Sequence, residues 1–159
     1  MGKIKQLKLV LDTAVVDKYN AYYFTQHPKA QKKAIEFPYH PSINVWSIKP
    51  RIQMNHLKQT WKAFIIHWIN ELGYTNLKLD KYEMEYRIYH PTKRRTDPDN
   101  FSPKFIMDGF TESGFIIDDD REHCKKLTIV CGVDKNNPRT EIIITILEEN
   151  QKKGMTDNG

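Results

Sequence analysis

Residues 93–121, KRRTDPDNFSPKFIMDGFTESGFIIDDDR, carry basic and acidic side chains in separate groups. Three consecutive cations come first, and two groups of carboxylates follow on either side of an amphipathic segment: Lys93, Arg94, Arg95; Asp97, Asp99; Asp118, Asp119, Asp120. Like charges a few ångströms apart raise one another's pKa, so clustered carboxylates cost free energy unless a cation lies among them. A divalent cation fills that role in many functional sites. The stretch therefore indicates a metal-binding site.

The middle of this stretch predicts a helix from 103 to about 113. Ser102 is a favoured cap residue, proline at 103 suits the first turn, and Gly114 fits the end. The face expected to be buried comprises Phe105, Ile106, Gly109 and Phe110. Such a helix is about 16 Å long at about 1.5 Å per residue. With its flanking loops, it is expected to bring both acid groups to one edge of the domain.

The segments around it predict three further elements. Residues 56–72 repeat apolar side chains at the three-and-four spacing of a helix, with Asn55 as a cap and Gly73 just past the end. Residues 77–90 alternate apolar and polar side chains from Tyr82 onward, as a strand with one buried face does. Residues 7–16 indicate an N-terminal strand.

Residues 126–133 and 140–148 predict a β-hairpin, with the turn at 134–139. The proline-rich segment 17–55 has no regular pattern, and its aromatic and basic side chains suit either contact with nucleic acid or a cover for the core. The predicted fold class is α+β, a small mixed β-sheet with helices packed on one face. We expect one domain over residues 1–149 and a disordered polar tail over 150–159.

The composition fits a soluble globular protein. Apolar residues make up 39% of the 159 residues and charged residues 28%, which excludes general disorder. No membrane span and no secretory signal are expected. Cys124 and Cys131 predict free thiols in a reducing cytoplasm, because on one strand they would lie about 23 Å apart. The net charge of +5 favours a polyanionic partner.

The two acid groups suit metal-assisted chemistry on phosphate. Asp97 and Asp99 are two residues apart in an extended segment, so their side chains point the same way and can share an ion. Oxygen ligands without paired Cys or His favour Mg²⁺, or Mn²⁺ as the alternative. One or two such ions activate water at a phosphodiester. Lys104, just inside the helix, is placed to neutralise charge on that phosphate.

Three simpler interpretations compete with a metal site. The D-x-D-N sequence resembles the start of a calcium loop, but Ser102 and Asp108 replace the required Gly and Glu. Asp97 and Asp99 could instead cap the following helix. The three consecutive aspartates could form a solvated turn.

These residues resemble the RusA-like Holliday junction resolvases of bacteria and of phages or prophages. The shared pattern is a basic run, D-x-D-N, a lysine, an aspartate one helical turn later and a D-D pair. In this chain it corresponds to Lys93-Arg94-Arg95, Asp97-Pro98-Asp99-Asn100, Lys104, Asp108 and Asp118-Asp119. The similarity covers about residues 58–148.

The resemblance implies a homodimeric, Mg²⁺-dependent endodeoxyribonuclease that makes paired nicks in four-way DNA junctions during recombination and repair, in a bacterial cytoplasm. By that resemblance Asp97, Asp99 and Asp119 hold metal, Asp118 supports them, and Lys104 is the catalytic cation. Lys93, Arg94, Arg95 and Arg121 would contact DNA. The alternatives are a metal-dependent nuclease on other branched DNA and a DNA-binding module without cleavage.

Overall fold

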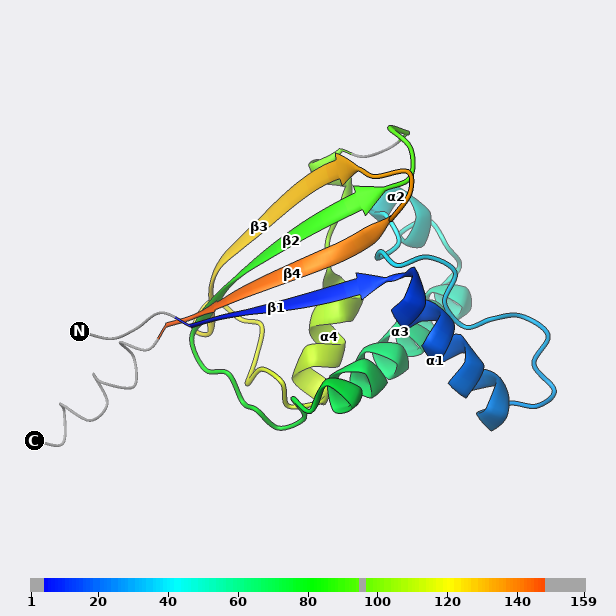
Figure 1. Cartoon of the computed structure of the whole chain (residues 1–159), viewed down its shortest axis with the longest axis horizontal. Helices are drawn as coiled ribbons and strands as arrows, with labels where there is room; N and C mark the ends of the chain where they lie inside the picture. Colours follow the sequence, from blue (N-terminus) through cyan, green and yellow to red (C-terminus); the bar gives the residue numbers. More distant parts are fainter. Residues whose placement is uncertain (1–4, 95–96, 148–159) are drawn as a thin grey trace, which may run out of the picture.

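The computed structural model describes residues 5–94 and 97–147, so Arg95 and the predicted tail at 150–159 lie outside the described residues. A mixed four-stranded sheet carries helices on one face, as the sequence predicts (Figure 1). The strands are β1 Lys5–Asp12, β2 Tyr82–His90, β3 Cys124–Val133 and β4 Arg139–Ile146. The helices are α1 Thr13–Gln26, α2 Ile43–Trp46, α3 Arg51–Leu72 and α4 Lys104–Glu112, with a short 3₁₀ helix, η1, at Pro98–Asn100.

The order of the strands is β1-β4-β2-β3. Strand β4 is antiparallel to both of its neighbours, whereas β2 and β3 are parallel. A parallel pair needs a crossover, and here η1 and α4 supply it. The residues that follow β2 and the residues that precede β3 therefore lie at opposite ends of the sheet.

The predicted hairpin of β3 and β4 is wrong. Residues 134–138 connect these strands, but β2 lies between them and pairs with both. Strand β4 has three successive isoleucines, and Ile142 and Ile144 are fully buried. Such a run suits a strand in the interior of a sheet rather than at its edge. Strand β3 is less buried and occupies the edge.

The predicted strand 7–16 is correct only in its first part. It ends at Asp12, whose carboxylate accepts a hydrogen bond of 3.0 Å from the backbone N–H of Val15. Asp12 thereby caps α1, and the chain turns from strand to helix. The segment 17–55, which has no regular pattern in the sequence, contains most of α1, all of α2 and the first residues of α3.

The helix predicted at 56–72 is confirmed, although it begins after Pro50, so Asn55 lies inside it. Gly73 follows its end with φ of 81°, in the left-handed region that favours glycine. Helix α4 crosses α3 where a Cβ on Gly109 would approach the Cβ of Ile65 to 2.5 Å. Only glycine fits there, so this residue sets how closely the two helices pack.

The core lies between the sheet and the helices. The inward side chains of β1, β2 and β4, with those of α3 and α4, are almost completely buried. The other face of the sheet has no helix over it in the described part of the chain (Figure 1). No helix among the described residues has the length and apolar character needed to cross a membrane.

Candidate functional site

Asp97 and Asp99, here called the η1 pair, lie where the chain leaves β2 for α4. Asp97 precedes η1, Asp99 is inside it, and both side chains are exposed. With Ile43 and Asn44 they line an open depression of about 590 Å³. The side chain of Asn100 accepts a hydrogen bond of 3.1 Å from the backbone N–H of Asn44 and so ties η1 to α2. The η1 pair is thus presented on an anchored turn.

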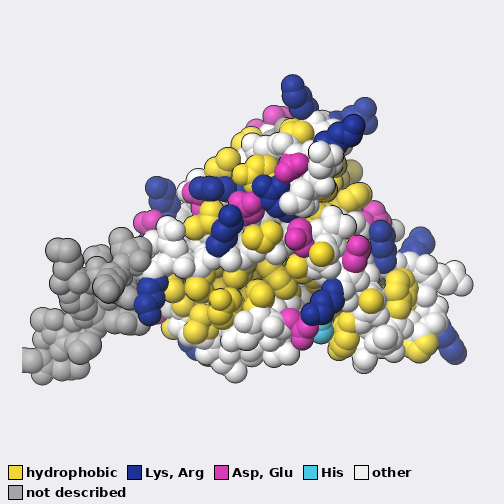
Figure 2. Space-filling model, viewed as in Figure 1, with side chains coloured by type: hydrophobic (Ala, Val, Ile, Leu, Met, Phe, Trp, Pro, Cys, Tyr) yellow, Lys and Arg dark blue, Asp and Glu magenta, His cyan; other side chains and the backbone are white. Residues whose placement is uncertain are grey.

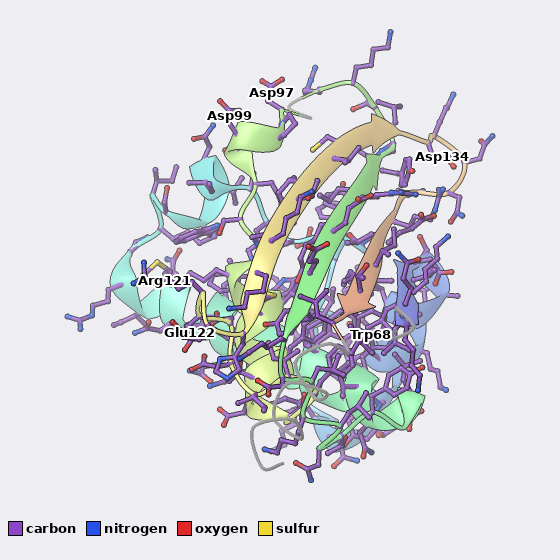
Figure 3. The ribbon with its side chains drawn as sticks, turned by 90° about the vertical axis from the view of Figure 1, so that its left-hand side faces the viewer. Trp68, Asp97, Asp99, Arg121, Glu122 and Asp134 are labelled. Atoms are coloured by element: carbon purple, nitrogen blue, oxygen red, sulfur yellow. The ribbon has the colours of Figure 1, made fainter. Side chains whose placement is uncertain are left out.

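The η1 pair lies beside the C-terminal end of β3. Burial, and then the negative charge of Asp97, raise the pKa of the Cys131 thiol, which places Asp97 near Cys131. In Figure 3, Asp97 and Asp99 lie close to the tip of the β3 arrow, whereas Arg121 lies near the start of the strand.

A second group of carboxylates, here called the β3-entry cluster, comprises Asp108, Asp118 and Asp119. Asp108 comes from α4, and the other two from the loop before β3. The three line one depression of about 410 Å³ together with Lys58 and Lys62 of α3. Lys62 also forms a 3.1 Å ion pair with Glu112. Carboxylates and cations from three segments therefore meet in one place.

The environment of Asp119 disfavours its negative charge. Burial, and then the hydrogen bond and charge of Asp118, raise the pKa of the Asp119 carboxyl, and Asp108 adds to the effect. Within the described residues, none of the three carboxylates forms an ion pair with Lys or Arg. A bound cation would relieve this repulsion.

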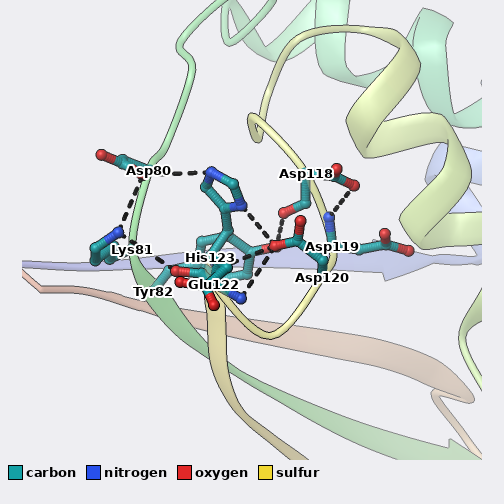
Figure 4. Close-up of polar contacts among 8 residues, drawn as sticks. All are labelled: Asp80, Lys81, Tyr82, Asp118, Asp119, Asp120, Glu122 and His123. Carbon is teal, nitrogen blue, oxygen red and sulfur yellow. Dashed lines mark hydrogen bonds and ion pairs between the residues drawn. The ribbon is translucent and has the colours of Figure 1, made fainter.

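Hydrogen bonds hold the loop that carries Asp118 and Asp119 (Figure 4). The hydroxyl of Tyr82 donates to the backbone carbonyl of Asp118 at 2.7 Å. Asp120 bonds Nδ1 of His123 at 2.6 Å, and this bond lowers the pKa of the Asp120 carboxyl. The same carboxylate accepts from two backbone N–H groups, those of Glu122 and His123. Asp120 therefore shapes the turn into β3.

One chain does not bring the η1 pair and the β3-entry cluster together. Asp119 lies near Cys124, and after burial its negative charge raises the pKa of the Cys124 thiol. Asp97 has the same effect on the thiol of Cys131. These two cysteines occupy opposite ends of β3 and are free, as predicted. At about 3.3 Å per residue, their separation of seven residues spans about 23 Å. Across residues 5–94 and 97–147, no three His, Cys, Asp or Glu side chains group closely enough to hold a metal ion.

Lys104 begins α4, on the side of the helix nearer the η1 pair, and its side chain is exposed. The sequence predicts that Ser102 caps α4. The helix instead begins after Pro103, which takes the cap position and provides no side-chain hydrogen bond. His40 supplies a substitute, because its Nε2 accepts a hydrogen bond of 3.0 Å from the backbone N–H of Phe105. Its Nδ1 donates to the carbonyl of Pro41 at 2.7 Å. His40 thereby fixes the start of α4.

Burial lowers the pKa of His40 to about 4, with the Pro41 hydrogen bond acting in the opposite direction. The imidazole is therefore neutral at pH 7, as the acceptor role of Nε2 requires. His40 belongs to the segment 17–55, which has no regular pattern in the sequence, and no local pattern predicts this contact across the fold.

The predicted DNA-contacting residues Lys93 and Arg94 follow β2 with exposed side chains, and Arg121 is exposed in the loop before β3. They therefore accompany the η1 pair and the β3-entry cluster, respectively. The RusA-like pattern predicts Asp108 as the aspartate one helical turn after Lys104, and the structure groups it with Asp118 and Asp119. Its position four residues after Lys104, on the less buried side of α4, was the available signal.

The uncovered face of the sheet is polar but not positive. Basic and acidic side chains alternate over it in Figure 2 rather than gathering by sign. Lys8 pairs with Glu141 at 3.5 Å, and Arg139 bonds both Glu141 and Asp134 at 2.8 Å. These pairs neutralise the face, so the candidate site belongs to the side of the sheet that carries the helices.

Comparison with known proteins adds no assignment: no family model matches this chain, and no curated protein matches it significantly.

Proposed function

We propose that this protein is a metal-dependent endodeoxyribonuclease that nicks branched DNA, with the four-way junction as its substrate, and that it acts as a homodimer. The observation that supports it most is the β3-entry cluster, where the Asp119 pKa is raised and lysines line the same depression. A carboxylate whose pKa is raised by burial and by a neighbouring carboxylate, beside cations, is typical of functional sites. The choice of the four-way junction as substrate rests on the resemblance of residues 58–148 to RusA-like resolvases.

The donor atoms fit Mg²⁺ or Mn²⁺. The η1 pair and the β3-entry cluster offer only carboxylate oxygens, the ligands that these hard cations prefer. Cys124 and Cys131 lie nearby, and burial raises the pKa of both thiols, which disfavours the thiolate form that binds metal. Asp97, Asp99, Asp118 and Asp119 would hold the ion, which would lower the pKa of a bound water.

The other residues act on the DNA phosphates. Lys104 neutralises negative charge that develops on the phosphate as water attacks phosphorus and the bond to the leaving oxygen breaks. Lys58 and Lys62 border the β3-entry cluster, and Lys93 and Arg94 accompany the η1 pair. Contacts of this kind bind the backbone of any sequence and weaken as salt increases.

The separation of the two acid groups is the reason for proposing two copies. A two-fold pair of chains can place the η1 pair of one copy beside the β3-entry cluster of the other, and symmetry then creates two equivalent sites. Two sites suit a substrate that is itself two-fold and is cut in two strands.

The first test measures nicking of a synthetic four-way junction, a fork and a plain duplex, with Mg²⁺ and with chelator. We expect junction nicking that needs Mg²⁺ and that falls at least roughly 100-fold in Asp99→Asn, which loses a metal ligand. Asp17→Asn, an exposed change on α1, should retain activity. Undiminished nicking by Asp99→Asn, or full activity in chelator, would disprove the proposal. Binding without nicking under any divalent ion would favour the DNA-binding module.

The second test mixes two inactive variants, Asp99→Asn and Asp119→Asn, after unfolding and refolding them together. If each site combines Asp99 of one copy with Asp119 of the other, a mixed dimer has one intact site. That site uses Asp99 from the Asp119→Asn chain and Asp119 from the Asp99→Asn chain. Half of randomly formed dimers are mixed, so about a quarter of wild-type nicking should return. No recovery would mean that each site lies within one chain.

A further inference from the structure

Helix α2 borders two depressions. Ile43 and Asn44 line the one that holds the η1 pair, whereas Ser42 and Val45 line another of about 340 Å³, here called the aromatic pocket. Most of the remaining lining comes from residues 34–41, from α3 and from the end of β2, which α2 adjoins (Figure 1). Because α2 is four residues long, or about 6 Å, the two depressions are close neighbours.

Stacked rings form one wall of the aromatic pocket. Phe37 lies nearly parallel to Tyr39, with 5.3 Å between the ring centroids and 7° between the planes, and Phe37 remains 52% exposed. Tyr39 in turn contacts His90, with 4.5 Å between the ring centroids. Burial raises the pKa of Tyr39 and lowers that of His90, so both rings are uncharged at pH 7. A stack that ends in an exposed ring can be extended by another flat ring, and every base of DNA has such a face.

Residues 34–41 form no helix or strand, yet three buried polar side chains hold them in place: Asn20, Thr140 and His40. Asn20 bonds both the backbone N–H and the carbonyl of Ile35, at 3.0 and 2.8 Å. The Thr140 hydroxyl donates to the carbonyl of Pro38 at 2.8 Å, and His40 bonds the start of α4. These are three of the five buried polar or charged side chains in the described part of the chain. The aromatic pocket is therefore preformed.

Two charged side chains in the lining suit the polar edge of a base. Glu36 and Lys49 both line the aromatic pocket, and neither forms an ion pair within the described residues. A carboxylate accepts a hydrogen bond from a base amino group, and an ammonium group donates to a base oxygen or ring nitrogen. Lys32 and Lys33, exposed just before this segment, add positive charge for the phosphates of the same strand. A wholly apolar partner would leave Glu36 and Lys49 without hydrogen bonds, so a nucleotide fits better.

We infer that the aromatic pocket binds one unstacked base of a DNA strand, with the exposed face of Phe37 as the stacking surface. A strand whose phosphate lies at the η1 pair can place a nearby base in this pocket, because both depressions border α2. Bases that are unpaired leave their stack at the lowest cost. Residues 34–49, which carry Phe37, lie outside the stretch that resembles RusA-like resolvases, so the resemblance does not imply this pocket. The inference rests on the proposed function for the DNA substrate, but the binding is measured without cleavage.

The test is the affinity of the full chain for two short oligothymidine strands, measured by fluorescence anisotropy in chelator at one fixed salt concentration. One strand is natural, and the other has the same backbone without bases. We expect Phe37→Ala to weaken binding of the natural strand at least about fivefold, because a stacked base is lost. Binding of the strand without bases should not change, since phosphate contacts do not use this ring. Phe37 is half exposed, so the variant should keep the wild-type circular dichroism spectrum.

Three further variants separate stacking from apolar cover. Phe24→Ala is the matched control, since Phe24 is an exposed phenylalanine on α1 that does not line the aromatic pocket, and it should bind both strands as the wild type does. Phe37→Tyr keeps a flat ring and should keep the wild-type affinity. Phe37→Leu keeps an apolar side chain without a flat ring, so it should bind as weakly as Phe37→Ala.

Several outcomes would overturn the inference: unchanged binding by Phe37→Ala, an equal loss for both strands, or wild-type affinity in Phe37→Leu. A changed sedimentation coefficient of Phe37→Ala with unchanged strand binding would also overturn it, because a second copy would then cover the pocket. Base-dependent binding through Phe37 without nicking under any divalent ion would uphold the inference and reject the proposed function. Junction nicking that needs Mg²⁺, by a wild type that binds both strands equally, would do the reverse.

Discussion

At the scale of single residues, His40 connects a poorly patterned segment to the start of α4. Its ring is buried and packs against Phe105 and Trp61, and its Nε2 accepts the Phe105 N–H. Protonation of Nε2 removes this acceptor. The backbone at the start of α4, which includes Lys104, is then held by one hydrogen bond fewer.

This contact makes stability depend on pH. The folded-state pKa of His40 is about 4, below its usual value of about 6.5, so between these values the unfolded chain binds the proton more tightly. The free energy of unfolding should therefore fall as pH falls from about 6.5 to about 4, by on the order of 3 kcal/mol from this residue. Urea unfolding across this range checks the slope. His40→Gln should remove that part of the slope, and His56→Gln, at an exposed position, should keep it.

The surroundings of Asp119 predict that its carboxylate lowers the free energy of unfolding without metal and raises it when metal binds. Its carboxyl is held among like charges, so Asp119→Asn should raise the free energy of unfolding in chelator by on the order of 0.5 kcal/mol. Mg²⁺ should raise the melting temperature of the wild type, because a ligand that binds only the folded state stabilises it. Mg²⁺ should raise the melting temperature of Asp119→Asn by less. Asp17→Asn is the control, and an equal effect of Mg²⁺ on all three proteins would contradict a site at Asp119.

At the scale of elements, the packing of α4 on α3 depends on Gly109. A methyl group at this position would overlap Ile65, which is fully buried in the middle of α3 and cannot move aside. Gly109→Ala should lower the free energy of unfolding by about 1–3 kcal/mol, despite the better helix propensity of alanine. Thr111→Ala, on the same helix, should change it by about 0.5 kcal/mol or less. Denaturant unfolding of both variants compares them, and a neutral Gly109→Ala would contradict this packing.

The elements with a clear hydrophobic period were predictable, and their arrangement was not. Helices α3 and α4 and strand β2 follow from the spacing of apolar residues in the sequence. The hairpin failed because a short connection does not require its strands to pair, and the triple isoleucine of β4 was the overlooked sign of an interior strand. Helix α1 was missed because its apolar side chains form no clear stripe, and its start depends on one cap, Asp12.

At the scale of the whole molecule, the sequence predicts that the two acid groups meet at one edge of the domain, whereas the structure places them near opposite ends of β3. The parallel pairing of β2 with β3 separates them, because a crossover returns the chain to the far end of the sheet before β3 begins. No sequence period reports the direction in which two strands pair. The distance between the η1 pair and the β3-entry cluster therefore became known only from the fold.

The position of β4 between β1 and β2 also has a consequence for synthesis on the ribosome. Strand β1, which is synthesised before the other described strands, pairs along all eight of its residues with β4, which is synthesised after them. Contacts between residues far apart in the sequence slow folding, and apolar surface stays exposed until they form. Leu9 and Leu11 therefore remain without their strand partner until residues 139–146 have left the exit tunnel. The nascent chain is most open to aggregation and to chaperones just before these residues emerge.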